Sequence, residues 1–117
     1  MLKDKIDESS DIVRHESAGG FLFHQTSEGN LLVALPKKKE GGYRMPKGHI
    51  KNGETPNEAA LREVIEELSL KIKPKLLKKV LKYDYSFSLP DDKRKQYKEV
   101  HVYIFTTDRK LDVAPLR

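Results

Sequence analysis

Glutamate side chains gather within residues 54–67 of a chain that is otherwise basic. The 117 residues carry a formal net charge of +5, yet this segment has one arginine, Arg62, and five glutamates: Glu54, Glu58, Glu63, Glu66 and Glu67. Lysines and arginines flank it, six within residues 37–51 and six more within residues 71–82. Charge runs often form a solvated surface. In the functional alternative, carboxylates hold a metal ion beside lysines that hold a polyanion.

Three of these glutamates share one face of a predicted helix. At about 100° per residue, Glu63, Glu66 and Glu67 lie together, opposite an apolar stripe made of Leu61, Val64, Ile65 and Leu68. Glu63 is three residues from Glu66 and four from Glu67, and each like-charge pair at such a spacing costs roughly 0.2 to 0.5 kcal/mol in an isolated helix. We expect Arg62 to point to the side, so that no cation relieves all three. A hard, oxygen-binding cation such as Mg²⁺ would turn this repulsion into coordination.

The loop before this helix is suited to an anion. It runs from Tyr43 to Glu54 and contains three basic side chains and two glycines: Arg44, Lys47, Lys51, Gly48 and Gly53. Glycine lets the backbone approach a ligand closely, and a helix N-terminus favours negative charge. An ordinary glycine-containing turn between a strand and a helix would have the same composition.

The surrounding pattern predicts a single α/β domain. Thr55, Pro56 and Glu58 form a capping box that starts a helix ending near Leu68. Apolar alternation and β-branched residues predict strands over 18–25, 31–35, 81–89 and 100–106, with turns at 27–30 and 90–93. The strict alternation over 81–89 predicts a half-buried strand. Residues 1–15 are weakly patterned and are expected to form a loosely held lead-in, which places the domain at 16–117.

Composition excludes several classes of protein and site. The chain has no cysteine, which removes disulfides, thiolate metal sites and cysteine nucleophiles. Apolar runs stop at four or five residues, and the first residues lack the apolar stretch of a secretory signal. We therefore expect a cytoplasmic protein with no membrane association.

Residues 48–70 resemble the signature of the Nudix hydrolases. That signature is written as Gly, five residues, Glu, seven residues, Arg-Glu, an aliphatic residue, one residue, Glu-Glu, one residue, Gly and an aliphatic residue. In this chain the nine positions are occupied by Gly48, Glu54, Arg62, Glu63, Val64, Glu66, Glu67, Ser69 and Leu70. Eight of them match the signature, and Ser69 is the exception. The spacing agrees with the turn and helix that the residues predict by themselves.

The resemblance implies a fold and a reaction. The fold would be an α/β/α sandwich around a mixed β-sheet. The reaction would be hydrolysis of a nucleoside diphosphate linked to another group, with Mg²⁺ as cofactor and Mn²⁺ as the alternative. Metal ions can lower the pKa of bound water and neutralise charge that develops on phosphate.

The resemblance also implies roles for individual residues. The metal ligands would include two glutamates of the helix and one main-chain carbonyl, those of Glu63, Glu67 and Lys47. Glu66 would be a further ligand or the base that deprotonates the attacking water. Arg62 and Glu54 would orient these groups through a salt bridge.

Within the family, residues 46–49 resemble the Pro-Lys-Gly-His opening of the diadenosine tetraphosphate hydrolases. In that subgroup a tyrosine stacks on adenine and a lysine that opens the next strand contacts phosphate, which implies these roles for Tyr83 or Tyr85 and for Lys98. Sheet packing is the alternative for the tyrosines, and a solvated edge position is the alternative for the lysine. Lys47 and His49 are assigned to substrate binding. His49, next to Lys47, is a candidate for a phosphate contact, and a structural or surface histidine is the alternative.

The chain departs from the family pattern at two places. Ser69 replaces the glycine that follows the helix, where a left-handed conformation is common, so we expect a cost of about 1 kcal/mol or a reshaped exit while the carboxylates are unaffected. Family members also usually continue past the last predicted strand with an acidic ligand, a strand and a closing helix, whereas this chain stops at Arg117. We therefore expect a fold that lacks part of the C-terminal strand and helix.

Three functions are consistent with these residues. The leading one is hydrolysis of diadenosine polyphosphates by attack of water at phosphorus. The second is pyrophosphohydrolase activity on nucleoside triphosphates or on capped RNA. The third is a non-catalytic nucleotide- or RNA-binding module on a Nudix scaffold, which Ser69, the short C-terminus and the basic surface favour. The intact Glu63, Glu66 and Glu67 oppose it.

Overall fold

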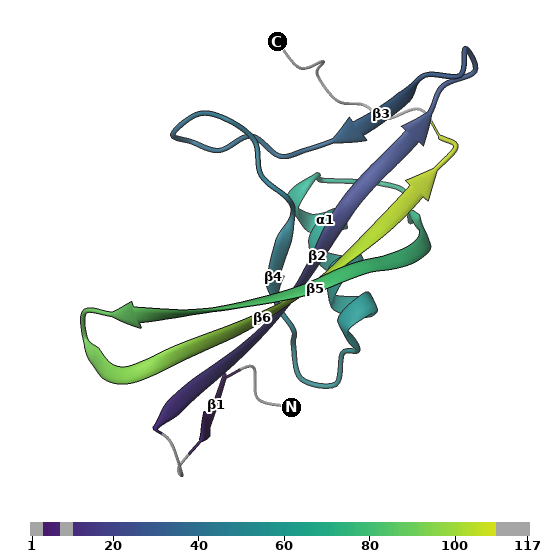
Figure 1. The fold of residues 1–117 in the computed structure, drawn as a ribbon. Helices are drawn as coiled ribbons and strands as arrows, with labels where there is room; N and C mark the ends of the chain where they lie inside the picture. The colour runs from purple at the N-terminus through teal and green to yellow at the C-terminus, as the bar shows by residue number, and fades with distance from the viewer. Residues whose placement is uncertain (1–3, 8–10, 110–117) are drawn as a thin grey trace.

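The computed structural model describes residues 4–7 and 11–109, in which one mixed β-sheet carries one α-helix. In chain order the elements are β1 (Asp4–Asp7), β2 (Ile12–Gln25), β3 (Leu31–Ala34), β4 (Lys47–His49), α1 (Pro56–Glu67), β5 (Lys75–Leu89) and β6 (Asp92–Thr107). Figure 1 shows the long strands β2, β5 and β6 running across the molecule beside α1. Within the described ranges, no helix combines the length and the apolar character needed to cross a membrane.

The sheet is organised around β2. Its antiparallel neighbours are β1, β3 and β4, and β6 runs parallel to it. β5 pairs antiparallel with β6 and is the outer strand of the order β1-β2-β6-β5. β4 can approach β2 because Gly19 has no side chain: a Cβ there would lie 2.1 Å from the carbonyl oxygen of Pro46.

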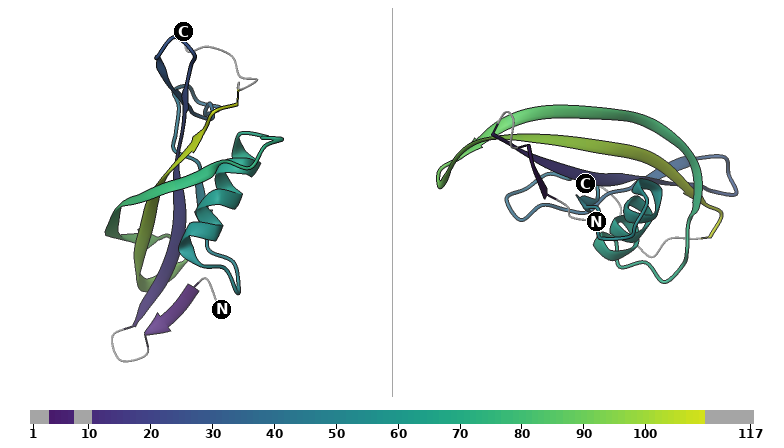
Figure 2. Two further views of the ribbon diagram at one scale, coloured as in Figure 1. Left: turned by 90° about the vertical axis from the view of Figure 1, so that its right-hand side faces the viewer. Right: turned by 90° about the horizontal axis from the view of Figure 1, so that it is seen from below.

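The core lies between α1 and one face of the sheet. Figure 2 shows α1 against that face. The core residues with no exposed surface are Ala18, Leu22, Ala59, Ala60, Val64 and Phe105. Small residues on both the helix and β2 allow a close approach, so this packing fixes the height and rotation of the glutamate-bearing face of α1 above the sheet.

This arrangement confirms the predicted mixed α/β fold class and the predicted helix. The main-chain N–H of Glu58 donates to Thr55 Oγ1 at 3.3 Å, and the main-chain N–H of Thr55 donates to Glu58 Oε1 at 2.9 Å, which completes the capping box. Residues 4–7 and 11–109 contain α1 as their single helix, so the second helical layer of an α/β/α sandwich is not found among them.

The predicted strands are present, and three of them are longer than their local patterns indicated. β2 begins at Ile12, and β1 pairs with its first residues, with Asp4 opposite His15. The sheet therefore begins before residue 16, inside the segment expected to be a loosely held lead-in. Parallel pairing with β6 continues back to Ile12, and such long-range hydrogen bonds leave little trace in the local sequence.

The prediction that residues 81–89 form a half-buried strand is wrong in its burial. The alternation does place Tyr83 and Tyr85 on one face, since their rings stack. However, Leu81, Tyr83 and Tyr85 are 48%, 38% and 42% exposed. β5 is the outer strand and packs mainly against β6 within the described residues. A period of two fixes which side chains share a face, but burial requires a second layer on that face.

The helix ends in a left-handed turn at Ser69. Its φ is 51°, its main-chain N–H donates to the carbonyl of Glu66, and the N–H of Leu70 donates to the carbonyl of Ile65. These two bonds are those of a Schellman motif, in which glycine is preferred at the position of Ser69. The serine has therefore kept the helix exit that the family glycine would form, at a cost in backbone strain.

We expect Ser69→Gly to raise the free energy of unfolding by about 1 kcal/mol, because glycine adopts a positive φ without a clash of Cβ. Urea denaturation followed by circular dichroism would measure the change. Ser69→Ala is the control, because it keeps the Cβ and should bring no gain. Equal stability of the glycine variant and the wild type would contradict the strain.

Candidate active site

The guanidinium of Arg62 joins the loop, β4 and the helix. Its Nε and Nη2 donate to the two oxygens of Glu54 at 2.6 and 2.9 Å. Its Nη1 donates to Glu63 Oε2 at 2.7 Å and to Glu66 Oε1 at 2.9 Å. Its Nη2 also donates to the main-chain carbonyl of His49 at 3.0 Å. We call these contacts the Arg62 network.

This network corrects the expectation that Arg62 points to the side of the glutamate face. The side chain instead reaches both Glu63 and Glu66 and offsets their mutual repulsion. Glu67 is paired separately with Arg44, which lies in the loop before β4. The two residues are 23 positions apart, so helical spacing gave no sign of this pair.

Gly48 is required by its contact with Glu63. A Cβ at residue 48 would lie 2.4 Å from the carboxylate carbon of Glu63. β4 holds Gly48 in this place through antiparallel pairing with β2, where Gly48 is opposite Ala18. Any larger residue would displace the Glu63 carboxylate from the Arg62 network.

The Arg62 network also sets the charge state of Glu54. The hydrogen bonds from Arg62 hold the pKa of Glu54 below its ordinary value of 4.5, and this effect is partly opposed by burial. The main-chain N–H of Lys51 donates to Glu54 Oε1 at 2.8 Å and lowers the pKa further. The pKa of Arg62 is raised, chiefly by its hydrogen bond to Glu54. Both groups are therefore ionised at neutral pH.

The carboxylates of α1 suit a hard divalent cation. Arg62 and Arg44 use one oxygen each of Glu63, Glu66 and Glu67, which leaves the second oxygen of each carboxylate for a metal ion or its waters. Mg²⁺ prefers carboxylate oxygens and keeps several waters, so the oxygens need not meet at one point. This set of oxygen donors fits Mg²⁺.

The aromatic residues and the lysine assigned to substrate binding lie on the other face of the sheet. On β6 the side chains of Tyr103 and Phe105 lie in the core beneath α1. Successive side chains of a strand alternate between its faces, so Lys98, an odd number of residues away from both, faces away from the helix. Tyr85 pairs with Lys98, and Tyr83 shares its face through the ring stack. The structure therefore brings these three residues together, but not onto the face that carries the glutamates.

A row of rings connects this surface to β4. His49 stacks on His15 with centroids 6.1 Å apart, and His15 contacts Phe87 at 5.7 Å. Phe87 contacts Tyr85 at 5.9 Å, and Tyr85 stacks on Tyr83 at 6.3 Å. Because the carbonyl of His49 belongs to the Arg62 network, this ring row begins beside the glutamates and ends on the outer strand.

β4 separates its side chains between the two faces. Gly48 is directed at the glutamates of α1, so its neighbours Lys47 and His49 face the side of the ring row by strand alternation. Lys47 is opposite Gly19 in the sheet. Both predicted phosphate contacts therefore lie on the face of the ring row, with Gly48 between them facing the glutamates.

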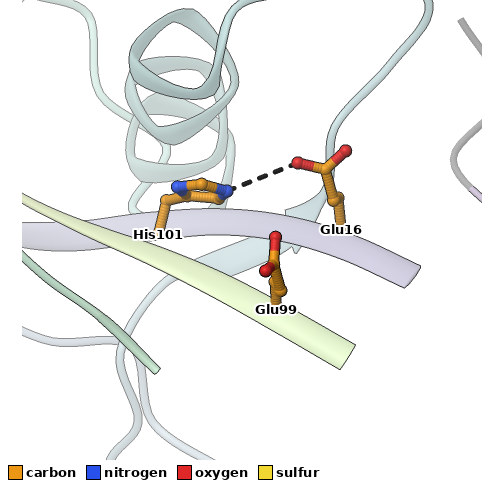
Figure 3. Close-up of side chains that lie close together, drawn as sticks. All are labelled: Glu16, Glu99 and His101. Atoms are coloured by element: carbon orange, nitrogen blue, oxygen red, sulfur yellow. Dashed lines mark hydrogen bonds and ion pairs between the residues drawn. The ribbon is translucent and has the colours of Figure 1, made fainter. Parts of the chain in front are cut away.

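Sequence reasoning missed a cluster formed by Glu16, Glu99 and His101. Their ligand atoms all lie within 4.8 Å of one another, and Figure 3 shows the three side chains together on β2 and β6. The parallel register places Glu16 opposite Glu99 and Ala18 opposite His101. The only signal in the sequence was the alternation of each strand, and alternation does not reveal which strands are neighbours.

Comparisons with known proteins identify the family and the fold. The model of the NUDIX domain matches residues 13–116. The crystal structure of C. elegans Ap4A hydrolase aligns with a TM-score of 0.52 and 16% identity, covering 85% of this chain and 74% of that one. A Nudix hydrolase from M. smegmatis, RenU, aligns with a TM-score of 0.60 and 21% identity, covering 89% of this chain and 65% of that one. These two likenesses are likenesses of fold. No curated protein matches the chain.

The lowered pKa of Glu54 makes part of the stability depend on pH. A carboxyl whose pKa is lower in the folded state stabilises the fold above its unfolded pKa, near 4.5, and this stabilisation is lost as the pH falls through the folded value. We therefore expect the free energy of unfolding to be higher for the wild type than for Glu54→Gln. This difference should be largest at pH 6–7 and should shrink towards pH 3. Urea titrations of both proteins at several pH values would measure it. A difference that does not change with pH would contradict the role of Arg62.

Proposed function

This chain belongs to the Nudix family, and from that starting point we propose that it hydrolyses a phosphoanhydride bond in a nucleotide. The substrate that we propose is a diadenosine polyphosphate. The observation that carries the proposal is the Arg62 network, which holds Glu63 and Glu66 on α1, with Glu63 close against the backbone of Gly48. The spacing of the signature and the contacts of its side chains thus support the same site.

We propose that Glu63, Glu66, Glu67 and the main-chain carbonyl of Lys47 hold the divalent ion, which is Mg²⁺ or Mn²⁺. When bound, such an ion neutralises charge on the phosphates and lowers the pKa of a bound water. The chain contributes the alignment of its carboxylates. Glu54 accepts two hydrogen bonds from Arg62 and so orients its guanidinium. Arg62 in turn donates to one oxygen of Glu63 and to one oxygen of Glu66. Positioning and electrostatics supply most of the catalysis in phosphoryl transfer.

The ring row supports a substrate with a base at a distance from the cleaved phosphates. A phosphate chain held near Lys47 and His49 would leave the base free to stack along the rings that lead to Tyr85 and Tyr83. Exposed aromatic rings offer stacking to any base. Lys98 pairs with Tyr85 across β6 and β5, which is a suitable place for a second phosphate contact.

We expect Glu67→Gln to lower Mg²⁺-dependent turnover about 10²- to 10³-fold, the usual effect of removing one group that stabilises charge in a transition state. The fold should be retained, because the surface pair with Arg44 contributes little to stability. Product chromatography would be run on diadenosine polyphosphates, nucleoside triphosphates and capped RNA.

Glu40→Gln, in an exposed loop, is the matched control and should keep full activity. Equal turnover by Glu67→Gln would refute the metal site. A preference for triphosphates or capped RNA would replace the proposed substrate, and a folded wild type that is inactive on the whole panel would favour the binding module.

Tyr85 provides a test of base stacking. We expect Tyr85→Ala to raise KM by an amount equivalent to about 1–3 kcal/mol, with little change in kcat, because stacking on the base is lost while the glutamate face is unchanged. Tyr85→Phe keeps the ring and should behave as wild type. An unchanged KM in Tyr85→Ala would place the base elsewhere.

A further inference from the structure

We infer that Glu16, Glu99 and His101 form a binding site for a divalent transition ion of the zinc type, separate from the glutamates of α1. The imidazole nitrogen and one oxygen of each carboxylate lie within 4.8 Å of one another. Figure 3 shows the ring of His101 directed at the carboxylate of Glu16, with the carboxylate of Glu99 close to both. Zn²⁺ takes imidazole nitrogen and carboxylate oxygen as ligands, and three protein ligands with one water are a common set.

One of the three ligand-to-ligand distances already suits a tetrahedral ion. Two ligand atoms about 2.1 Å from a tetrahedral ion are about 3.4 Å apart. His101 Nε2 and Glu16 Oε2 are already 3.4 Å apart. The side chain of Glu99 is 29% exposed, so it has the freedom to complete the set by a change of rotamer.

The strands β2 and β6 hold all three ligands on a rigid frame. β2 and β6 are hydrogen-bonded in parallel, with Glu16 opposite Glu99, and the residue opposite His101 is the fully buried Ala18. The imidazole of His101 is itself buried, with 8% of the residue exposed. A buried imidazole that contacts the carboxylate of Glu16 differs from the exposed acidic clusters that are common on protein surfaces. Ligands on sheet strands are also positioned better than ligands on loops.

The ligand set distinguishes this site from the glutamates of α1. Mg²⁺ binds oxygen and has little preference for imidazole, whereas Zn²⁺ and its neighbours in the transition series bind imidazole well. The α1 site offers only oxygen donors. The two sites should therefore be filled by different ions when both ions are present.

Two lysines contact members of this cluster in the structure. Lys79 Nζ donates to His101 Nδ1 at 3.1 Å, and Lys82 Nζ is 3.5 Å from Glu99 Oε2. Because lysine can only donate, Nδ1 is the acceptor and Nε2 carries the proton in the neutral ring. An ion at Nε2 requires that proton to move to Nδ1 and Lys79 to turn away. Lys79 Nζ also lies 5.8 Å from the ring centroid of Tyr103, and this contact does not depend on the hydrogen bond to His101.

The test is calorimetric titration of Zn²⁺ into the whole chain in excess Mg²⁺, which occupies the α1 glutamates. We expect one equivalent of Zn²⁺ to bind to the wild type and to Glu67→Gln alike. His101→Gln and Glu99→Gln should each weaken this binding more than about tenfold. Lys82→Met should tighten it, because a competing cation is removed.

His24→Gln is the matched control, since His24 has the same 8% exposure and lies on β2, with Nδ1 3.1 Å from the carbonyl oxygen of Thr107. It should bind Zn²⁺ as the wild type does. Circular dichroism would confirm that each variant is folded, and Glu99→Gln, whose side chain is partly exposed, keeps the test decisive if His101→Gln does not fold. Loss of Zn²⁺ binding in Glu67→Gln, or unchanged binding in Glu99→Gln, would overturn the inference. Neither outcome depends on whether the chain hydrolyses nucleotides.

Discussion

The five hydrogen bonds of the Arg62 guanidinium are the interaction on which the candidate active site depends. Like charges on neighbouring turns of a helix repel, and the segment that holds Arg62 carries five glutamates. A planar, permanently charged group can bind one carboxylate with two bonds and still reach two others. Arg62 therefore makes a dense acidic site compatible with a stable helix, and its bond to the carbonyl of His49 fixes that helix to β4.

β4 connects two surfaces of different chemistry. Its middle residue, Gly48, lies against Glu63 on the side of α1, while Lys47 and His49 face the other side and lead into the ring row. A strand of three residues can do this because successive side chains point to opposite faces. The metal-binding and base-binding parts of the proposed site are thus set on opposite faces of one sheet and meet at this strand.

Much of this arrangement was predictable. The capping box at Thr55 and Glu58 placed the start of the helix, and the spacing of residues 48–70 placed the glutamates on one face and identified the family. Alternation over residues 81–89 placed Tyr83 and Tyr85 together. Burial of that strand was not predictable, because it depends on whether another layer covers the face. Ser69 was expected to strain the helix exit, and its positive φ confirms the conformation that causes the strain.

The sequence by itself determined the contacts that act over one or two helical turns and over one strand. These include the capping box and the shared face of Glu63, Glu66 and Glu67. Only the tertiary structure decided which cations neutralise the glutamates, and it alone brought together Glu16, Glu99 and His101. The physical reason is that pairing between strands, and between a loop and a helix, is set by backbone hydrogen bonds and packing across many residues. Those interactions impose no fixed spacing on the sequence.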